Sequence, residues 1–179
     1  MQIIQEVGLK RIFKYAVFSF WQAIFDLLPF SPLRVFWLKV GGAKIGANNF
    51  IDKIDFFNLD RTGLSGLTIG SHCFIGRDCL LDLAGKITLN DWVTISPRVI
   101  ILSHTNVGLR GHPLLKYYPA QTGHTQIQSS CFLGANSMIL SGIKISPLSL
   151  IAAGSVVTHS FPGHRLIAGS PAQAKKILK

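Results

Sequence analysis

The sequence is poor in acidic residues. Only 8 Asp and Glu stand against 18 Lys and Arg in 179 residues, which gives a formal charge of +10, and no acidic residue follows Asp91. The C-terminal half is therefore expected to attract anions. The basic residues are spread singly, without a basic helix or an aromatic RNA-binding signature, so no nucleic-acid partner is expected. A phosphorylated cofactor or an anionic membrane surface suits this charge better.

Cysteine is scarce as well. The three cysteines, Cys73, Cys79 and Cys131, show no metal-ligand spacing. Each follows an apolar residue of the repeat described below by four positions, which predicts small side chains buried at tight corners rather than a disulfide or a reactive thiol. This usage indicates a reducing compartment, and we expect the protein in the cytoplasm.

Long apolar runs are missing too. The uncharged stretch near the N-terminus reaches only from Tyr15 to Phe25, which is too short to span a bilayer comfortably. Residues 1–40 are instead predicted to form an amphipathic helical segment that Pro29 and Pro32 interrupt, with a second helical turn covering the first coil of the fold. Two interpretations of the first helix stay open. It lies on the inner face of the cytoplasmic membrane as a peripheral anchor, or it packs across one end of the fold or against another subunit. A signal peptide is disfavoured, because no small-residue cleavage site follows.

The dominant pattern is an apolar residue at every sixth position. The positions are Ile45, Ile51, Phe57, Gly63 (the one exception), Ile69, Ile75, Leu81, Ile87, Val93 and Val99, and after a break Ile127, Leu133, Ile139, Ile145, Ile151 and Val157. A period of six fits neither an α-helix nor an alternating strand. It predicts a solenoid in which three hexads close one triangular coil, positions three hexads apart superpose, and the apolar residue of each hexad points into the core.

Several of these hexads carry a family resemblance. Ile69-Gly70, Ile75-Gly76, Leu133-Gly134 and the segments 151–158 and 168–172 resemble the left-handed parallel β-helix acyltransferases built from hexapeptide repeats. The resemblance covers roughly residues 40–175. It implies an all-β solenoid with an N-terminal helical segment at 1–40, a left-handed β-helix acyltransferase domain at 41–179 and a short C-terminal helix. It also implies a homotrimer with active sites between subunits.

The break in the repeat is an insertion at residues 105–126. A long loop on a rigid repeat scaffold is usually functional. His104 stands where the loop departs, at the position that matches the family's catalytic histidine, and a neutral imidazole there would act as general base. His112 and His124 are the second candidates, as substrate-facing residues. The group that orients His104 stays open between a backbone carbonyl, an acid of an earlier coil and an acid of another subunit, with Asp82 and Asp91 nearest in sequence. A metal site is not expected, because the spacing of His104 and His112 does not fit the zinc-binding relatives of this fold.

The last coils suggest where a cofactor lies. Ala135, Ala153 and Pro171 follow one another at the interval of three hexads, so they are predicted to stack as a shallow column of small side chains. In the resembling acyltransferases pantetheine occupies such a groove between subunits. The matching residues here are Phe132, Ala135, Ala153 and Thr158, with Arg165, Lys175 and Lys176 suited to the phosphates of acetyl-CoA; the alternative for the two lysines is a solvated terminal helix.

Together these features predict an O-acetyltransferase that moves an acetyl group from acetyl-CoA to a hydroxyl of a sugar or of a lipid-linked or other cell-envelope polysaccharide precursor. An N-acetyltransferase acting on an amino-sugar nucleotide and a non-catalytic β-helix scaffold are the alternatives. Scaffolding requires neither His104 nor the insertion, which favours the enzyme.

Overall fold

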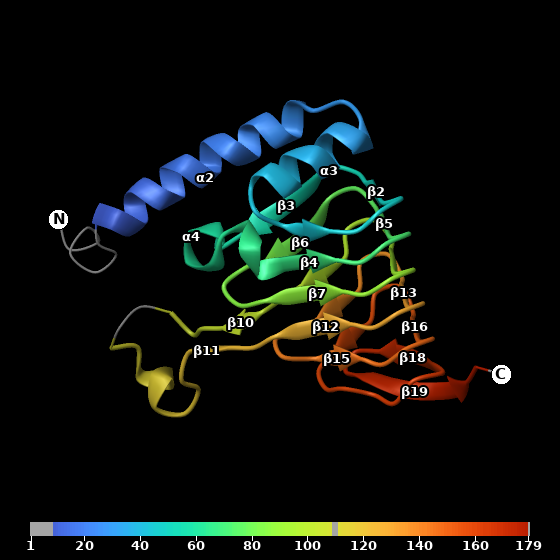
Figure 1. Ribbon diagram of the computed structural model, residues 1–179. Helices are drawn as coiled ribbons and strands as arrows, with labels where there is room; N and C mark the ends of the chain where they lie inside the picture. The colour runs from blue at the N-terminus through green and yellow to red at the C-terminus, as the bar shows by residue number, and fades with distance from the viewer. Residues whose placement is uncertain (1–8, 109–110, 179) are drawn as a thin grey trace.

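The computed structural model describes residues 9–108 and 111–178; the first eight residues of the predicted N-terminal segment lie outside this range. Two helices come first, α2 (Leu9–Leu27) and α3 (Ser31–Val40). They are separate because Pro29 and Pro32 cannot continue a helix, whereas a proline at the start of a helix costs no hydrogen bond. The chain then winds through a stack of coils, with short helical turns α4 (Leu59–Thr62) and η1 (Leu64–Gly66) inserted in an early coil (Figure 1).

Each complete coil contributes one short strand to each of three parallel sheets. The first sheet contains β1 (Lys44–Ile45), β4 (Leu67–Ile69), β7 (Ile87–Leu89), β12 (Thr125–Ile127) and β15 (Lys144–Ile145). The second contains β2 (Phe50–Ile51), β5 (Phe74–Ile75), β8 (Thr94–Ile95), β13 (Phe132–Leu133), β16 (Leu150–Ile151), β18 (Arg165–Gly169) and β19 (Ala172–Ile177). The third contains β3 (Ile54–Phe57), β6 (Cys79–Asp82), β9 (Ile100–Ile101), β14 (Met138–Ile139) and β17 (Val156–Val157).

The core lies inside the coils, as the period of six predicts, but Phe57 is not part of it: Phe56, opposite Leu81, packs against the core instead, and Phe57 is 52% exposed. The six residues at positions 69, 75, 81, 87, 93 and 99 are all at most 1% exposed. The predicted stacking at intervals of three hexads is correct only after the insertion, where Ile127 pairs with Ile145. Before it, Ile69 pairs with Leu89 instead of with Ile87, the partner that the simple frame predicts.

This shift of register has a local cause. After Leu81 the strand β6 continues to Asp82, and a turn follows before β7 begins at Ile87. This coil is therefore longer than three hexads. In the next coil the apolar positions Val93 and Val99 therefore stack with Cys73 and Cys79 at the corners instead of with the strand centres. They are buried as corner residues, and not as the inward-facing strand residues that an uninterrupted period of six predicts.

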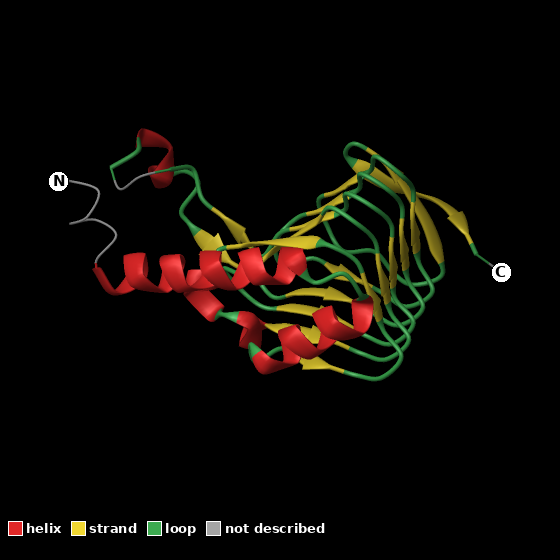
Figure 2. Ribbon diagram, turned by 90° about the horizontal axis from the view of Figure 1, so that it is seen from above, coloured by secondary structure: helices red, strands yellow, loops and turns green. Residues whose placement is uncertain are grey.

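The N-terminal end of the stack is covered by helices. α3 packs on β1 and β2 and buries Leu38 completely, which confirms the predicted cap over the first coil. The C-terminal half of α2 also packs there, with Trp21 stacked on Trp37 at 5.9 Å between ring centroids. Its N-terminal half projects beyond the coils, on the same side as the insertion (Figures 1 and 2). A membrane crossing would need a longer apolar helix than any in residues 9–108 and 111–178.

The predicted short C-terminal helix is wrong. The chain ends in an antiparallel hairpin of β18 and β19 that closes the opposite end of the stack. β16 leaves a sheet edge open for pairing, and β18 takes it, with Ile151 opposite Ile167, so the last coil is shorter than three hexads. Pro171 therefore does not continue the column of Ala135 and Ala153; Gly169 takes the next position.

Candidate active site

His104 leaves the core at the start of the insertion. β9 ends at Ile101, Ser103 is still fully buried, and the side chain of His104 is 18% exposed. β10 (His104–Thr105) pairs antiparallel with β11 (Gln121–Thr122), so both ends of the insertion are held together at this histidine. Between them the chain forms the short turn η2 (Pro113–Lys116).

Asp82 is the group that orients His104. Its Oδ2 atom lies 2.6 Å from Nδ1 of His104, and its side chain is fully buried. A carboxylate only accepts hydrogen bonds, so Nδ1 carries the proton and Nε2 keeps its lone pair free for chemistry. Of the alternatives left open by the sequence, the structure selects an acid of an earlier coil. The residues that lengthen this coil, beginning with Asp82 at the end of β6, therefore also supply the carboxylate.

Three N–H donors in addition to His104 hold the Asp82 carboxylate. Oδ1 accepts from Asn58 Nδ2 at 2.7 Å and from the Ala84 amide at 3.2 Å. Oδ2 accepts from the Ser103 amide at 2.8 Å, and the Ser103 hydroxyl, which donates to the backbone carbonyl of Asp82, lies 3.1 Å from Oδ2. Burial raises the pKa of the Asp82 carboxyl group, but the hydrogen bonds outweigh burial and hold that pKa below its usual value. Asp82 is therefore an anion at neutral pH, fixed against the imidazole.

Asn58 joins this pair from the corner between β3 and α4. Its backbone has φ 58°, a left-handed conformation that asparagine tolerates better than most residues. Its amide donates to Asp82 and lies 3.5 Å from Nδ1 of His104. The ring of the preceding residue, Phe57, lies 6.0 Å from the imidazole. Neither residue was predicted from the sequence as part of the site, because a left-handed corner has no periodic signal.

A small polar cleft opens beside His104. It has a volume of about 120 Å³ and is lined by Arg61 of α4 and by both ends of the insertion, including Asn106 and Gln121. Hydroxyl and amide groups with one guanidinium make this lining suited to a hydroxylated molecule. His112 and His124 do not line the cleft. Nδ1 of His112 accepts from the Leu114 amide and caps η2, whereas His124 bonds the Thr88 hydroxyl at 2.8 Å.

The residues predicted to bind the cofactor lie in three places. Ala135 and Ala153 adjoin at the corner after the second sheet, where the Gly154 amide donates to the carbonyl of Ala135. Phe132 lies at the start of β13, on the outer face of the second sheet, and is 40% exposed. Thr158 is exposed at the corner after the third sheet, two coils from Leu102 and so on the side of His104.

The basic candidates lie on the C-terminal hairpin. Arg165 opens β18 opposite Ile177, and Lys176 pairs with Leu166, while Lys175 falls at the irregularity between the Leu166–Lys176 and Ile167–Ala174 pairs. Both lysines are exposed. They stand at the end of the hairpin that is farther from Ala153.

The cysteines have the predicted structural role. Each is at most 2% exposed, and each thiol points at a backbone carbonyl of the adjacent coil, that of Asn90, Ser96 or Ser146. Burial raises the pKa of the Cys79 thiol to about 11. Across the described ranges, no group of three or more His, Cys, Asp or Glu side chains is arranged to hold a metal ion.

Comparisons with known proteins agree with this fold. Residues 127–159 match the family model described as the hexapeptide repeat of succinyl-transferase. The chain is 34% identical over 110 residues to serine acetyltransferase 4 of Arabidopsis thaliana, a match that covers 60% of this chain and 29% of that protein. It is 27% identical over 139 residues to a putative colanic acid biosynthesis acetyltransferase of Escherichia coli, which covers 78% of this chain and 71% of that protein.

Among solved structures, a galactoside acetyltransferase in complex with coenzyme A superposes with a TM-score of 0.81 at 21% identity, covering 97% of this chain and 85% of that one. The chain thus spans less than a third of the length of the Arabidopsis relative, whereas it covers 85% of the galactoside acetyltransferase chain. Its fold is the left-handed parallel β-helix that its sequence predicts, and its repeats over residues 127–159 are similar to those of the hexapeptide-repeat family.

Proposed function

We propose that this protein is an acetyl-CoA-dependent O-acetyltransferase that acetylates a hydroxyl of a sugar or of a cell-envelope polysaccharide precursor. The observation that carries the proposal is the pairing of partly exposed His104 with fully buried Asp82 at the mouth of a polar cleft. The names of the similar proteins, galactoside acetyltransferase and a putative acetyltransferase of colanic acid biosynthesis, support it.

His104 is the general base in this proposal. Asp82 holds the imidazole with Nδ1 protonated, so Nε2 takes the proton of the acceptor hydroxyl as its oxygen attacks the carbonyl carbon of the acetyl thioester. A carbon–oxygen bond forms, the carbon–sulfur bond breaks, and the imidazolium returns its proton to the departing thiolate. Asp82 stabilises the imidazolium meanwhile, because its carboxylate stays ionised. The transfer is direct, without an acyl-enzyme.

Acetyl-CoA supplies the activated acetyl group. Side chains no larger than a methyl group at Ala135 and Ala153, with Gly169 next in the column, leave a strip along which a thin chain such as pantetheine fits. Phe132 adjoins the strip, Thr158 stands at the corner on the side of His104, and the positive charges of Arg165, Lys175 and Lys176 suit the phosphates.

We propose a homotrimer with active sites between subunits, and the positions of these groups support it. In one chain the small-residue strip and His104 stand at different corners, at opposite ends of the strands of the third sheet. Acetyl-CoA bound along the strip of one subunit would then reach His104 of the next subunit. His112 and His124, proposed as substrate-facing residues, would lie at the same junction. The insertion would reach across this junction as part of a domain spanning residues 41–179.

The amphipathic segment favours a peripheral place on the inner face of the cytoplasmic membrane. Large apolar side chains are exposed along both helices, and they are Leu9, Ile12, Phe13, Tyr15, Val17, Phe20 and Leu27 of α2 and Leu33, Phe36 and Val40 of α3. The alternative, that the helix packs across the end of the fold, describes the C-terminal half of α2, because Phe25 is fully buried there. An exposed apolar stripe with basic residues nearby suits the headgroup region of anionic lipid.

The two alternatives, a non-catalytic scaffold and an N-acetyltransferase, have less support than the O-acetyltransferase. A scaffold has no use for a buried carboxylate that positions a partly exposed imidazole. An N-acetyltransferase for an amino-sugar nucleotide would use the same base, and acceptor preference separates it from the O-acetyltransferase.

The test is release of coenzyme A thiol in the presence of hydroxyl sugars or amino sugars. His104→Ala should lower kcat by about 10²–10⁴ and leave the Kd for acetyl-CoA nearly unchanged. His72→Ala is the matched control, since His72 is exposed and stacks on Trp92 away from this site. Full activity of His104→Ala would refute the assignment, and acceptance of amines alone would favour the N-acetyltransferase.

A further inference from the structure

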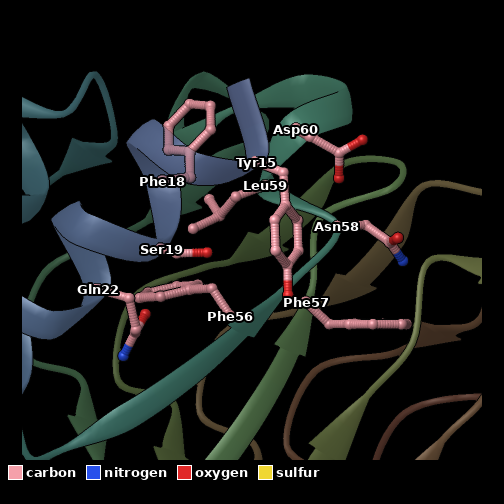
Figure 3. A pocket seen from close by; sticks show the side chains of 9 residues that line it. All are labelled: Tyr15, Phe18, Ser19, Gln22, Phe56, Phe57, Asn58, Leu59 and Asp60. Carbon is pink, nitrogen blue, oxygen red and sulfur yellow. The ribbon is translucent and has the colours of Figure 1, made fainter. Parts of the chain in front are cut away.

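A groove runs beneath α2, next to Phe57 and Asn58. Two adjoining hollows of about 270 and 280 Å³ form it, with α2 as the roof and β3 and α4 as the floor. Figure 3 shows Tyr15 extending from α2 toward Phe57, and Phe18 and Leu59 also line the first hollow. We call these two hollows the α2 groove.

The groove continues into the site described above. Phe57 and Asn58 line both of its hollows. The same two residues contact the catalytic pair, since the Phe57 ring lies 6.0 Å from the His104 ring and Asn58 donates to Asp82. A molecule lying in the groove would therefore have one end beside the imidazole.

The lining of the groove is chemically unlike that of the polar cleft. Phe18, Phe56, Phe57, Leu59 and Ile12 give it a largely carbon surface, with the ring of Tyr15 between the hollows. A bare sugar has a hydroxyl on most of its carbons, and burying these without partners costs free energy. An alkyl or polyisoprenyl chain has no such cost and removes apolar surface from water.

α2 is fixed in place as the roof. Arg11 forms an ion pair with Asp60 across the outer hollow. Gln22 closes the inner end by donating to Asp26 Oδ1 at 2.9 Å and to the carbonyl of Ile54 at 3.0 Å. Tyr15 and Phe57 nevertheless keep 67% and 52% of their surfaces exposed. Two half-exposed aromatic side chains that face a common groove offer contact area without needing a rearrangement.

We infer that the α2 groove binds the apolar chain of an amphiphilic acceptor, whose sugar head occupies the polar cleft at His104. The inference rests on the proposed function, and it narrows the acceptor to a lipid-linked sugar or other glycoside with an apolar aglycone. The polar cleft, His104, Phe57 and the α2 groove follow one another in this order, so the sugar head and the apolar chain of the acceptor would lie on either side of His104 and Phe57. Arg11, Ile12 and Tyr15, in the half of α2 that projects beyond the coils, line the second hollow, so a chain could enter it from a membrane surface.

The experiment uses alkyl glucosides and galactosides from methyl to octyl, below their micelle concentrations, with acetyl-CoA and detection of the released thiol. The kcat/KM should rise about two- to fourfold for each added methylene until the groove is filled. Tyr15→Ser should flatten this series. Phe13→Ser is the matched control, because Phe13 is an exposed aromatic of the same helix that lines neither hollow, and it should keep the full slope.

The outcomes separate the inference from the proposed function. Measurable transfer with equal kcat/KM for methyl and octyl glycosides would overturn the groove assignment and leave the acetyltransferase intact. If no glycoside is acetylated, saturation-transfer NMR with octyl glucoside still decides: chain-methylene signals that Tyr15→Asp abolishes and Phe13→Ser retains support the groove. Signals that are absent, or equal in both variants, overturn it.

Discussion

Asp82→Asn tests the central pair most directly. Asparagine has the size of aspartate but no charge, and its amide nitrogen is a donor. Oδ2 of Asp82 accepts from His104 at 2.6 Å and from the Ser103 amide at 2.8 Å, so an amide nitrogen in this place would meet two donors. If the amide turns instead, its nitrogen meets Asn58 and Ala84, which are also donors. Either orientation leaves a conflict, and the imidazole loses the partner that sets its tautomer.

The expected loss in kcat is about 10²–10⁴, the range for losing a correctly oriented base, which corresponds to roughly 3–5 kcal/mol in activation free energy. The KM for acetyl-CoA should change little, because Asp82 is fully buried and away from the small-residue strip. A merely structural defect would not separate kcat from KM in this way, so the separation identifies a positioning role.

The same variant should lose stability. Replacing hydrogen bonds to a charged acceptor costs about 1.5–3 kcal/mol, which lowers Tm by about 3–12 °C for a chain of this size. The folded-state pKa of Asp82 is depressed, so its stabilisation is complete above the unfolded value of about 3.9 and is lost as pH falls through the folded value. The Tm difference between wild type and variant should therefore shrink on acidification below about pH 4.

Asp91→Asn is the control, since Asp91 is an exposed acid that accepts only from the Ser71 amide at 2.7 Å among the described residues. It should keep wild-type kcat. If Asp82→Asn folds and turns over within about threefold of wild type, the Asp82–His104 pair does not orient the base and the reasoning fails.

Further outcomes test other parts of the structure. Ala153→Trp, at an exposed corner, should raise the KM for acetyl-CoA at least tenfold without dissociating the oligomer, by steady-state kinetics and light scattering; an unchanged KM would place the cofactor elsewhere. The Cys79 thiol, with its pKa at about 11, should resist a thiol reagent at pH 8 until the protein unfolds, and fast labelling of the native protein would contradict its burial. Phe13→Ser with Phe20→Ser should weaken binding to anionic liposomes about 10²-fold and spare Tm, whereas Trp21→Ser should lower Tm through the lost stack on the coil cap; equal liposome binding by all three proteins would favour packing alone.

The repeating part of the fold was readable from the sequence, because a buried position in a solenoid recurs at a fixed spacing. The shift of register was not, since Ile87, Val93 and Val99 are apolar in either register. Only pairing distinguishes Leu89 from Ile87 as the partner of Ile69, and that pairing depends on how the turn after Asp82 closes. Likewise no residue after Pro171 in the C-terminal segment forbids a helix. The segment forms a strand because β18 pairs with the open edge of β16 and β19 pairs with β18.

The candidate site was readable only in part. His104 was identified through the break in the repeat and its resemblance, and Asp82 was one of two acids named. The choice between Asp82 and Asp91 required the structure, where Asp91 accepts from Ser71 on an exposed corner. Asn58 and Phe57 could not be found, because their approach to the imidazole depends on a corner in another coil, far away in the sequence.

The insertion has a consequence for how such proteins diversify. Leu89 pairs with Ile127, and Ile127 in turn pairs with Ile145, so the coil that carries the insertion is about twice as long as the regular coil that follows it. Because the entropy of loop closure grows only with the logarithm of length, this detour costs about 0.6 kcal/mol more than a regular coil. The β10–β11 pair holds the loop ends together whatever lies between them. Loops of other lengths and compositions could therefore be grafted between Thr105 and Gln121 at little cost in folding, with the His104–Asp82 pair left in place and the lining of the polar cleft changed.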